Sequence, residues 1–333
     1  MRLQILAFVL CIAHAGTGAQ PAATFDLQAH RGARALWPEN TLPAFAHALG
    51  VGVTTIETDI AISRDGVLLL SHDPTLNPDI TRDSTAGFLA DRGPAIVTLT
   101  AAEVSRYDVG RIKPGSDYAR QFPQQQAVDG ARIPRLAELF ALVRKAGNEQ
   151  VRFAIETKVT PTAPAETVPP EVFARRLVAE IRLAGMEQRS AILSFDWRTL
   201  QLVQKEAPGI PTVYLTIQQA NFDNIGANRP QGSPWTAGFQ HRDHGSVPRM
   251  IKAAGGRTWS SFWRDLNAAS VREAQDLGLR VLAWTVNDVP TMARLIDMGV
   301  DGIVTDRPDL LRAEMQRRGM PLPRATPVAP WKP

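Results

Sequence analysis

The sequence predicts an α/β fold, a (β/α)₈ TIM barrel distorted by a β-hairpin arm and a small insertion after its second strand. Three observations carry this prediction. Short apolar runs alternate with helical patterns along residues 24–312, eight such runs occur, and no Gly-x-Gly-x-x-Gly follows any of them. Repeated strand–helix units form parallel sheets, and eight of them favour a closed barrel. A doubly wound open sheet is the alternative, weakened by the missing glycine pattern.

The expected strands are short apolar runs at 24–29, 54–62, 151–156, 191–194, 212–216, 258–261, 280–284 and 302–305. Apolar residues at helical spacing predict helices at 134–146, 171–183, 198–206, 268–277 and 290–298. Another helix follows Asn40, its expected N-cap, and ends near residue 49, with Pro43 in its first turn. These elements account for most of the barrel.

Two stretches break the alternation of strands and helices. Residues 74–132 are rich in turn residues, and we interpret them as an insertion over one face of the barrel. Residues 218–256 are rich in Asn, Gly, Gln and Pro and predict a long loop after a strand. His241 and His244 in this loop have the spacing of a metal-binding pair, but a solvated polar loop is the favoured interpretation.

Composition sets the class of protein. The chain has 333 residues, of which 44% are hydrophobic and 21% charged, which is typical of a globular protein. Lys and Arg number 37 against 33 Asp and Glu, and no dense basic run occurs, so we expect no nucleic-acid partner. The proline-rich residues 320–333 predict a disordered tail.

The first nineteen residues predict a secretory signal peptide. Arg2 is the only charge among them, an apolar run covers 3–13, and small residues allow cleavage after Ala15 or Ala19. A buried N-terminal helix is the alternative. No later run is apolar enough to span a bilayer, so we expect a secreted or periplasmic protein without membrane insertion. The single cysteine, Cys11, lies in this segment, so the mature chain would have no thiolate ligand.

Polar residues gather where the predicted strands end, and this is where barrel enzymes carry their active sites. The residues concerned are His30 and Arg31, Glu57 and Asp59, Glu156 and Lys158, and Trp284. Glu57 and Asp59 alternate along one strand, so they share a face and lie about 6.6 Å apart along the backbone. Glu156 and Lys158 share a face for the same reason.

Carboxylates buried together need a compensating cation. Arg31 and Lys158 are two candidates, but a divalent ion held by Glu57, Asp59 and Glu156 is the simpler solution. All-oxygen ligands favour Ca²⁺ or Mg²⁺ over Zn²⁺. A network of ion pairs without metal is the alternative. Trp284 either lines the pocket or is a core aromatic residue that closes the barrel.

The Asp65-Gly66 pair predicts a β-hairpin that brings a second histidine to the site. A loop of two or four residues places His72 on the carboxylate face, about 5 Å from one of the acids. A loop of three residues would turn it away, and a surface histidine is the alternative. Two imidazoles, a cation and two fixed positive charges suit displacement at a phosphodiester, because charge develops at phosphorus and two protons must move.

Nine segments in order resemble the glycerophosphodiester phosphodiesterase family, in its secreted or periplasmic bacterial type. They are His30-Arg31-Gly32, Pro38-Glu39-Asn40-Thr41, Glu57-x-Asp59, Asp65-Gly66, His72-Asp73, Glu156-x-Lys158, Ser194-Phe195-Asp196, Trp284-Thr285-Val286-Asn287 and residues 299–306. Two places depart from the family pattern. Ser63 stands where Thr is usual, and residues 33–37 are bulky and carry an added charge.

The resemblance implies a distorted TIM barrel that hydrolyses glycerophosphodiesters to glycerol 3-phosphate and an alcohol. It implies a divalent cation, Ca²⁺ or Mg²⁺, on Glu57, Asp59 and Glu156. It also implies that His30 and His72 are the acid–base pair and that Arg31 and Lys158 contact the phosphate. Two alternatives stay open: a phospholipase D-type enzyme acting on lysolipids or sphingomyelin, and a non-catalytic phosphodiester-binding protein.

Overall fold

The computed structural model describes residues 24–328, so the predicted signal peptide lies outside the described residues. One nine-stranded sheet has the order β1-β9-β8-β7-β6-β5-β4-β2-β3, and β1 also pairs with β2. This last pairing closes eight parallel strands into a barrel, and β3 is attached antiparallel to β2. The predicted TIM-barrel fold with its hairpin arm is confirmed.

The barrel strands lie within two residues of their predicted positions. They are β1 (Asp26–Ala29), β2 (Thr55–Ile62), β4 (Arg152–Thr157), β5 (Ser190–Ser194), β6 (Thr212–Thr216), β7 (Thr258–Phe262), β8 (Arg280–Trp284) and β9 (Gly302–Thr305). The arm strand is β3 (Leu68–Leu70). All eight residues of β2 are buried, as expected for a parallel strand with both faces covered.

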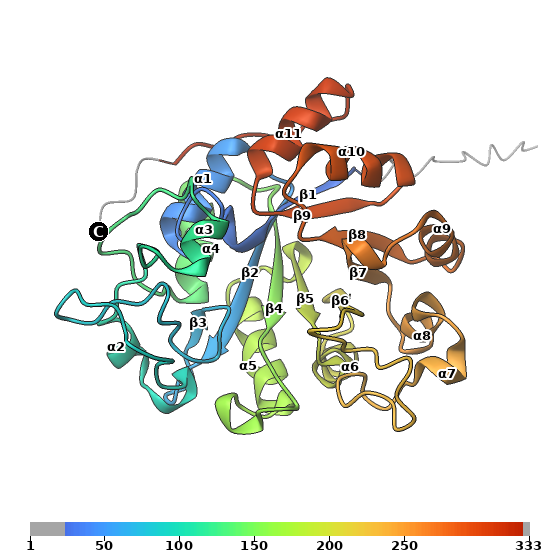
Figure 1. The fold of residues 1–333 in the computed structure, drawn as a ribbon, viewed down its shortest axis with the longest axis horizontal. Coiled ribbons are helices and arrows are strands. Elements are labelled where there is room, and N and C mark those ends of the chain that lie inside the picture. Colours follow the sequence, from blue (N-terminus) through green and yellow to red (C-terminus); the bar gives the residue numbers. More distant parts are fainter. Residues whose placement is uncertain (1–23, 329–333) are drawn as a thin grey trace, which may run out of the picture.

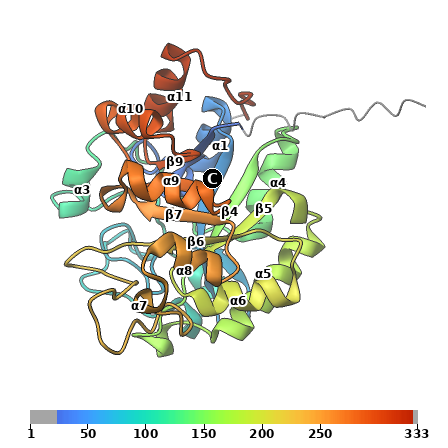
Figure 2. The same ribbon diagram turned by 90° about the vertical axis from the view of Figure 1, so that its right-hand side faces the viewer.

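Helices surround the strands (Figures 1 and 2). The longer ones are α1 (Leu42–Val51), α4 (Leu136–Lys145), α5 (Pro170–Leu183), α6 (Trp197–Glu206), α8 (Val247–Ala253), α9 (Ala268–Asp276), α10 (Val289–Met298) and α11 (Pro308–Arg317). In α4 the buried residues recur every three or four positions, which turns one apolar stripe toward the barrel. Residues 24–328 contain no helix whose length and hydropathy would let it cross a bilayer.

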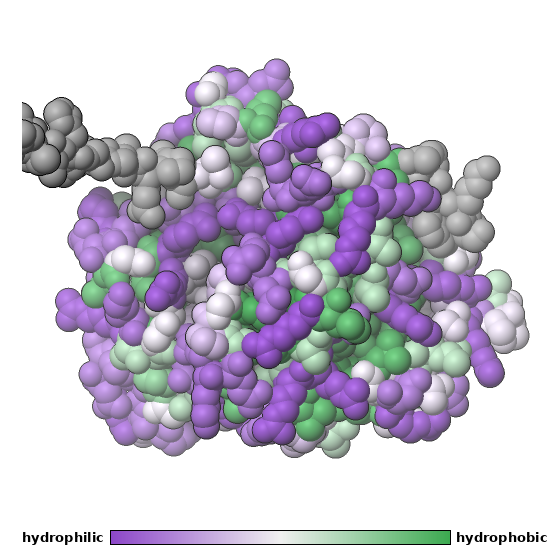
Figure 3. Space-filling view, turned by 180° about the vertical axis from the view of Figure 1, so that it is seen from behind, coloured by the Kyte–Doolittle hydropathy of each residue, from purple (hydrophilic) through white to green (hydrophobic). Residues whose placement is uncertain are grey.

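The insertion forms a small core of its own against β3. It carries α2 (Ala101–Val104) and α3 (Asp117–Gln121), and in Figure 1 the part around α2 lies beside β3. Its apolar side chains pack on Ala61 and Leu69 of the hairpin. The surface seen in Figure 3 is mainly hydrophilic, with apolar side chains in small groups. The contacts of the insertion with Ala61 and Leu69 anchor it on the hairpin.

Three local expectations need correction. Thr41 caps α1, because its hydroxyl accepts from the Ala44 N–H, whereas Asn40 has a φ of 53° and turns its side chain toward β2. The 218–256 stretch is only partly a loop, since it contains α7 (His241–His244) and α8. Disorder was expected over residues 320–333; residues 329–333 lie outside the described residues, but within the described part the Thr326 N–H donates to the Leu49 carbonyl at 2.8 Å.

Candidate active site

A tight turn after β1 carries the first two site residues. His30 and Arg31 form a single 3₁₀ turn with Gly32, and Arg31 and Gly32 have positive φ values of 49° and 79°. A Cβ atom on Gly32 would lie 2.8 Å from the Phe45 ring and 2.9 Å from the Ala44 methyl group. Only glycine lets the turn approach α1 this closely, and this approach sets the position of His30 and Arg31 at the mouth of the barrel.

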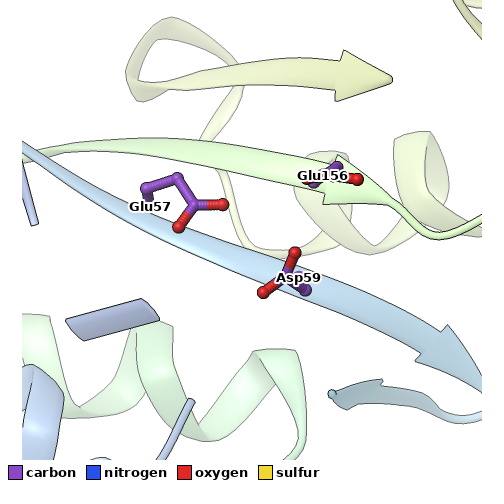
Figure 4. A group of neighbouring side chains, drawn as sticks. All are labelled: Glu57, Asp59 and Glu156. Carbon is purple, nitrogen blue, oxygen red and sulfur yellow. The ribbon is translucent and has the colours of Figure 1, made fainter. Parts of the chain in front are cut away.

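Three carboxylates come together on the neighbouring strands β2 and β4 (Figure 4). Asp59 and Glu156 are neighbours in register on the two parallel strands, and Glu57 lies one alternation earlier on β2. The exposed fractions of Glu57, Asp59 and Glu156 are 3%, 1% and 8%, and one oxygen of each lies within 4.8 Å of the others. The three acids expected to act as metal ligands are thus brought together; we call them the acid cluster.

Neighbouring groups compensate the acid cluster only in part. The Arg31 N–H donates to Glu57 at 2.8 Å, and the Lys158 ammonium donates to Glu156 at 2.6 Å. Burial and the other two carboxylates raise the pKa of Glu57 well above its ordinary value. Burial also raises the pKa of Glu156 to about 7, although Lys158 opposes this shift. These raised pKa values show that the neighbouring cations compensate the three carboxylates only in part.

These residues fit a hard divalent cation. Asp59 Oδ1 is buried, has no hydrogen-bond partner, and lies 3.6 Å from the Lys158 ammonium. The other oxygen of Asp59 accepts from the Asn40 amide at 2.9 Å, which fixes the carboxylate plane. An all-oxygen donor set with one unsatisfied inward oxygen suits Ca²⁺ or Mg²⁺. Within residues 24–328 this is the group of acidic side chains placed to hold an ion.

His30 is held by a carboxylate from the other end of the chain. Its Nδ1 lies 2.6 Å from Asp306 Oδ1, just beyond the end of β9, which leaves Nε2 free, 4.0 Å from Glu57. Asp306 also accepts from both Nε and Nη2 of Arg34 and from the Asn287 amide. Burial alone would raise the pKa of Asp306, but Arg34 and His30 hold it well below its ordinary value. Asp306 therefore stays ionised and orients the imidazole.

His72 reaches the same pocket, although the reasoning that placed it there was wrong. Ile62 pairs with Leu68 and the Ser63 N–H donates to the Val67 carbonyl, so the hairpin loop has three residues, 64–66. A continuing ladder would turn His72 away, but the chain bends at residues 72–74. His72 then lines the pocket with a side chain 31% exposed. Its Nδ1 lies 2.9 Å from Asp73 Oδ1.

The two histidines are thus oriented in the same way. Each has its Nδ1 beside a carboxylate, and Asp73 is itself fixed by the Asn77 amide at 2.7 Å. Burial and the cations Arg31 and Lys158 lower the pKa of His72, and burial lowers that of His30, although the Asp306 carboxylate opposes the shift of His30. A bound anion would favour protonation of one of them.

The pocket above the acid cluster has about 610 Å³ of empty space and two different walls. One wall consists of charged and titratable groups: His30, Arg31 and Arg34 follow β1, Glu57 lies on β2, His72 follows β3, and Glu156 lies on β4. The other is apolar and comes from β5 to β9: Leu193, Phe195, Leu215, Trp284 and Val304. The Trp284 indole donates to the Ser260 carbonyl at 3.0 Å, and its ring meets Phe195 edge to face with centroids 5.4 Å apart. Trp284 therefore lines the pocket, and its ring is fixed.

Sequence reasoning missed the residues that orient the site: Asp306, Arg34, Asp73 and Asn40. Asn40, Asp73 and Asp306 lie in segments that resemble the family, and Arg34 lies in residues 33–37, which depart from its pattern. The sequence therefore drew attention to these positions but did not show which residues they contact. His241 and His244 lie on α7, and neither lines the pocket. The structure gives them no place in the site.

Replacing Asp306 with asparagine is expected to lower kcat by about 10² or more, because His30 loses the partner that fixes its tautomer. The same variant tests stability. Since the folded pKa of Asp306 is depressed, the carboxylate stabilises the fold above its unfolded pKa of about 3.9, and the gain is lost as the pH falls. The Tm difference from wild type should be largest at pH 7 and shrink below about pH 4.

The matched control is Asp297→Asn, which removes an exposed carboxylate that pairs with Arg318 at the surface. It should change neither kcat nor the acid limb of the stability curve appreciably. Equal effects of the two variants would contradict the role given to Asp306.

Comparison with known proteins agrees with the geometry. The chain is 28% identical over 283 residues to a glycerophosphodiester phosphodiesterase of Caldanaerobacter subterraneus subsp. tengcongensis, covering 85% of this chain and 94% of that protein. It also resembles the crystal structure of a putative glycerophosphoryl diester phosphodiesterase from Silicibacter pomeroyi, with a TM-score of 0.80 and 32% identity over 90% of this chain and 95% of that one.

A third likeness concerns the fold alone. An Oleispira antarctica phosphodiesterase, whose structure was solved in complex with the product sn-glycerol-3-phosphate, has a TM-score of 0.61 and 21% identity over 87% of this chain and 96% of that one. Fold, site and relatives together define a TIM-barrel hydrolase of phosphoric diesters. The chain belongs to the glycerophosphoryl diester phosphodiesterase family, whose model matches residues 30–310.

Proposed function

We propose that the protein hydrolyses glycerophosphodiesters to glycerol 3-phosphate and an alcohol, with His30 and His72 as the acid–base pair at a divalent cation. The observation that carries the proposal is the convergence of two carboxylate-oriented imidazoles and the acid cluster on one pocket. The likeness to the glycerophosphodiester phosphodiesterase of Caldanaerobacter subterraneus supports the assignment of the substrate class.

The charged residues in and beside the pocket have different proposed roles. Arg31 and Lys158 flank the acid cluster, and their fixed charges would neutralise the phosphodiester and the charge that develops at phosphorus. A divalent cation on Glu57, Asp59 and Glu156 would add Lewis-acid stabilisation of the same charge. One imidazole takes the proton from the attacking oxygen and the other gives a proton to the leaving alkoxide, each through its free Nε2.

Two oriented imidazoles favour catalysis over binding alone. A non-catalytic phosphodiester-binding protein needs cations but gains nothing from two histidines held in fixed tautomers. The preference for the alcohol group of the substrate is best tested with a panel of substrates. The panel contains glycerophosphocholine, glycerophosphodiesters with other head groups and a lysolipid, each assayed with Ca²⁺, Mg²⁺ or chelator. Release of glycerol 3-phosphate from the deacylated substrates supports the proposal, whereas turnover of the lysolipid alone would favour the phospholipase D-type activity.

The apolar wall is proposed to hold the substrate beside the charged wall. Replacing Trp284 with alanine is expected to raise KM about tenfold and to change kcat less, because the substrate loses an apolar contact outside the reacting atoms. Trp263→Ala is the matched control, since Trp263 is also half-buried but does not line the pocket. A fall in Tm with an unchanged KM in Trp284→Ala would instead assign Trp284 to the core.

We propose further that the protein acts outside the cytoplasm, in the periplasm or the medium, on the strength of the signal-like residues 1–19. Detection of the chain in the periplasmic or culture fraction, shortened after Ala15 or Ala19, tests this. A full-length cytoplasmic chain would contradict it.

A further inference from the structure

A second cavity lies at the opposite end of the barrel from the acid cluster. It has about 680 Å³ of empty space and is lined by residues that open their strands: Asp26 of β1, Arg152 of β4, Ser190 of β5 and Arg280 of β8. Arg189, which precedes Ser190, lines it as well. We call this cavity the basal pocket. It is separate from the pocket that holds the two histidines.

The carboxylate in the basal pocket is already satisfied by other groups. Asp26 Oδ1 accepts from the Thr55 hydroxyl at 2.7 Å, and Oδ2 accepts from the Gln28 amide at 3.0 Å. The nearest guanidinium nitrogens of Arg152 and Arg280 lie 3.2 and 4.0 Å from Oδ2, without directed hydrogen bonds to it. The two arginines therefore form ion pairs with the carboxylate but donate no directed hydrogen bond to it.

Several buried polar atoms of the basal pocket have no hydrogen-bond partner. Among them are Nη2 of Arg152 and both Nε and Nη2 of Arg280. Oγ of Ser190 is also unpartnered, although Ser190 is only 3% exposed. Donors left unpaired in a cavity cost free energy, so they favour an acceptor that can take several N–H and O–H groups at once.

The basal pocket carries a net positive charge, which favours a negatively charged hydrogen-bond acceptor. Arg189 donates to the backbone carbonyls of Val151 and Asn148, so it adds a cation and no acid. Three guanidinium groups and the single carboxylate of Asp26 give the pocket an excess of two positive charges. The side chains of Arg152 and Arg280 are 39% and 35% exposed, which leaves the pocket open to small solutes.

We propose that the basal pocket binds a small dianionic oxyanion, namely phosphate or a phosphate monoester. A planar guanidinium presents paired N–H groups that match phosphate oxygens, and Arg152 and Arg280 reach the pocket from strands on different sides of the barrel. The Ser190 hydroxyl supplies a further donor. Two negative charges on the ligand would balance the excess of positive charge. The site is independent of the proposed hydrolysis.

Calorimetric titration of the full chain with inorganic phosphate, and separately with glycerol 3-phosphate, tests the proposal. Chelator is present throughout, so that no divalent cation at the acid cluster can hold an anion in the other pocket. We expect binding by wild type, at least tenfold weaker binding by Arg280→Gln and Arg152→Gln, and unchanged binding by Arg272→Gln, an exposed arginine on α9. Binding of both probes would define a general phosphate site, and binding of glycerol 3-phosphate alone a monoester site.

Folding and hydrolysis are measured beside binding. Should an arginine variant fail to fold, Ser190→Ala removes one donor at a small cost, and weaker binding by that variant supports the proposal. All these variants should retain wild-type hydrolysis, so their result does not depend on the proposed activity. Two results would overturn the proposal: absence of binding by wild type, or equal binding by wild type and Arg280→Gln. Either would leave the arginines a purely structural role at the base of the barrel.

Discussion

Alanine in place of His30 should reduce kcat/KM for glycerophosphocholine by roughly 10²–10⁴, the usual contribution of a positioned acid or base. His72→Ala should cause a loss of similar size. The imidazoles act in one displacement, so the double variant should lose much less than the product of the two single losses. Release of glycerol 3-phosphate is the measurement, with a divalent cation present.

The matched control for these variants is His47→Ala. His47 lies on α1, packs its ring on Trp37 with centroids 5.6 Å apart, and does not line the pocket. Its replacement should leave kcat/KM unchanged. Full activity of either His30→Ala or His72→Ala would remove that residue from the acid–base pair, whereas equal losses in all three variants would point to damage to the fold.

Chelation of divalent cations should abolish turnover, and addition of Ca²⁺ or Mg²⁺ should restore it. The same cations should raise the Tm of the chelated protein, because an ion that binds only the folded state stabilises it by mass action. Glu57→Gln should lose both responses. In chelator, however, Glu57→Gln should be more stable than wild type, since it removes one of three carboxylates that repel one another in a buried site.

Glu149→Gln, which alters an exposed carboxylate outside the acid cluster, serves as the control and should behave as wild type. An undiminished rate in excess chelator would mean that Arg31 and Lys158 alone compensate the acid cluster, as in the ion-pair alternative. A Tm response to Ca²⁺ or Mg²⁺ that survives in Glu57→Gln would place the ion elsewhere.

Periodicity and strand ends were enough to predict much of this molecule. Strand ends identify Glu57, Asp59, Glu156 and Lys158, because alternation along a parallel strand fixes which side chains face the barrel interior. The position of His72 follows from a bend after the hairpin, which pairing rules do not describe. His72 therefore lines the pocket although the predicted loop lengths were wrong.

Contacts between distant segments were beyond this reasoning. Asp306 stands beside His30 only because β1 and β9 pair, and the strand pattern does not say which carboxylate will orient which imidazole. The Asn40 side chain shows the same limit: its residue type suits a helix cap, yet tertiary contacts with Thr58 and Asp59 use it instead. The preference of a residue type for a helix cap is overridden when its side chain can hydrogen-bond to a buried polar partner elsewhere in the fold.

The pairing of the first and last strands has a consequence for how activity arises during synthesis. His30 and Asp306 are 276 positions apart, so a growing polypeptide lacks the orienting carboxylate until nearly all of it has been made. The step that closes the barrel by pairing β1 with β9 is therefore also the step that brings Asp306 beside His30. A truncated product that ends before residue 302 would keep the acid cluster and both histidines and still be inert.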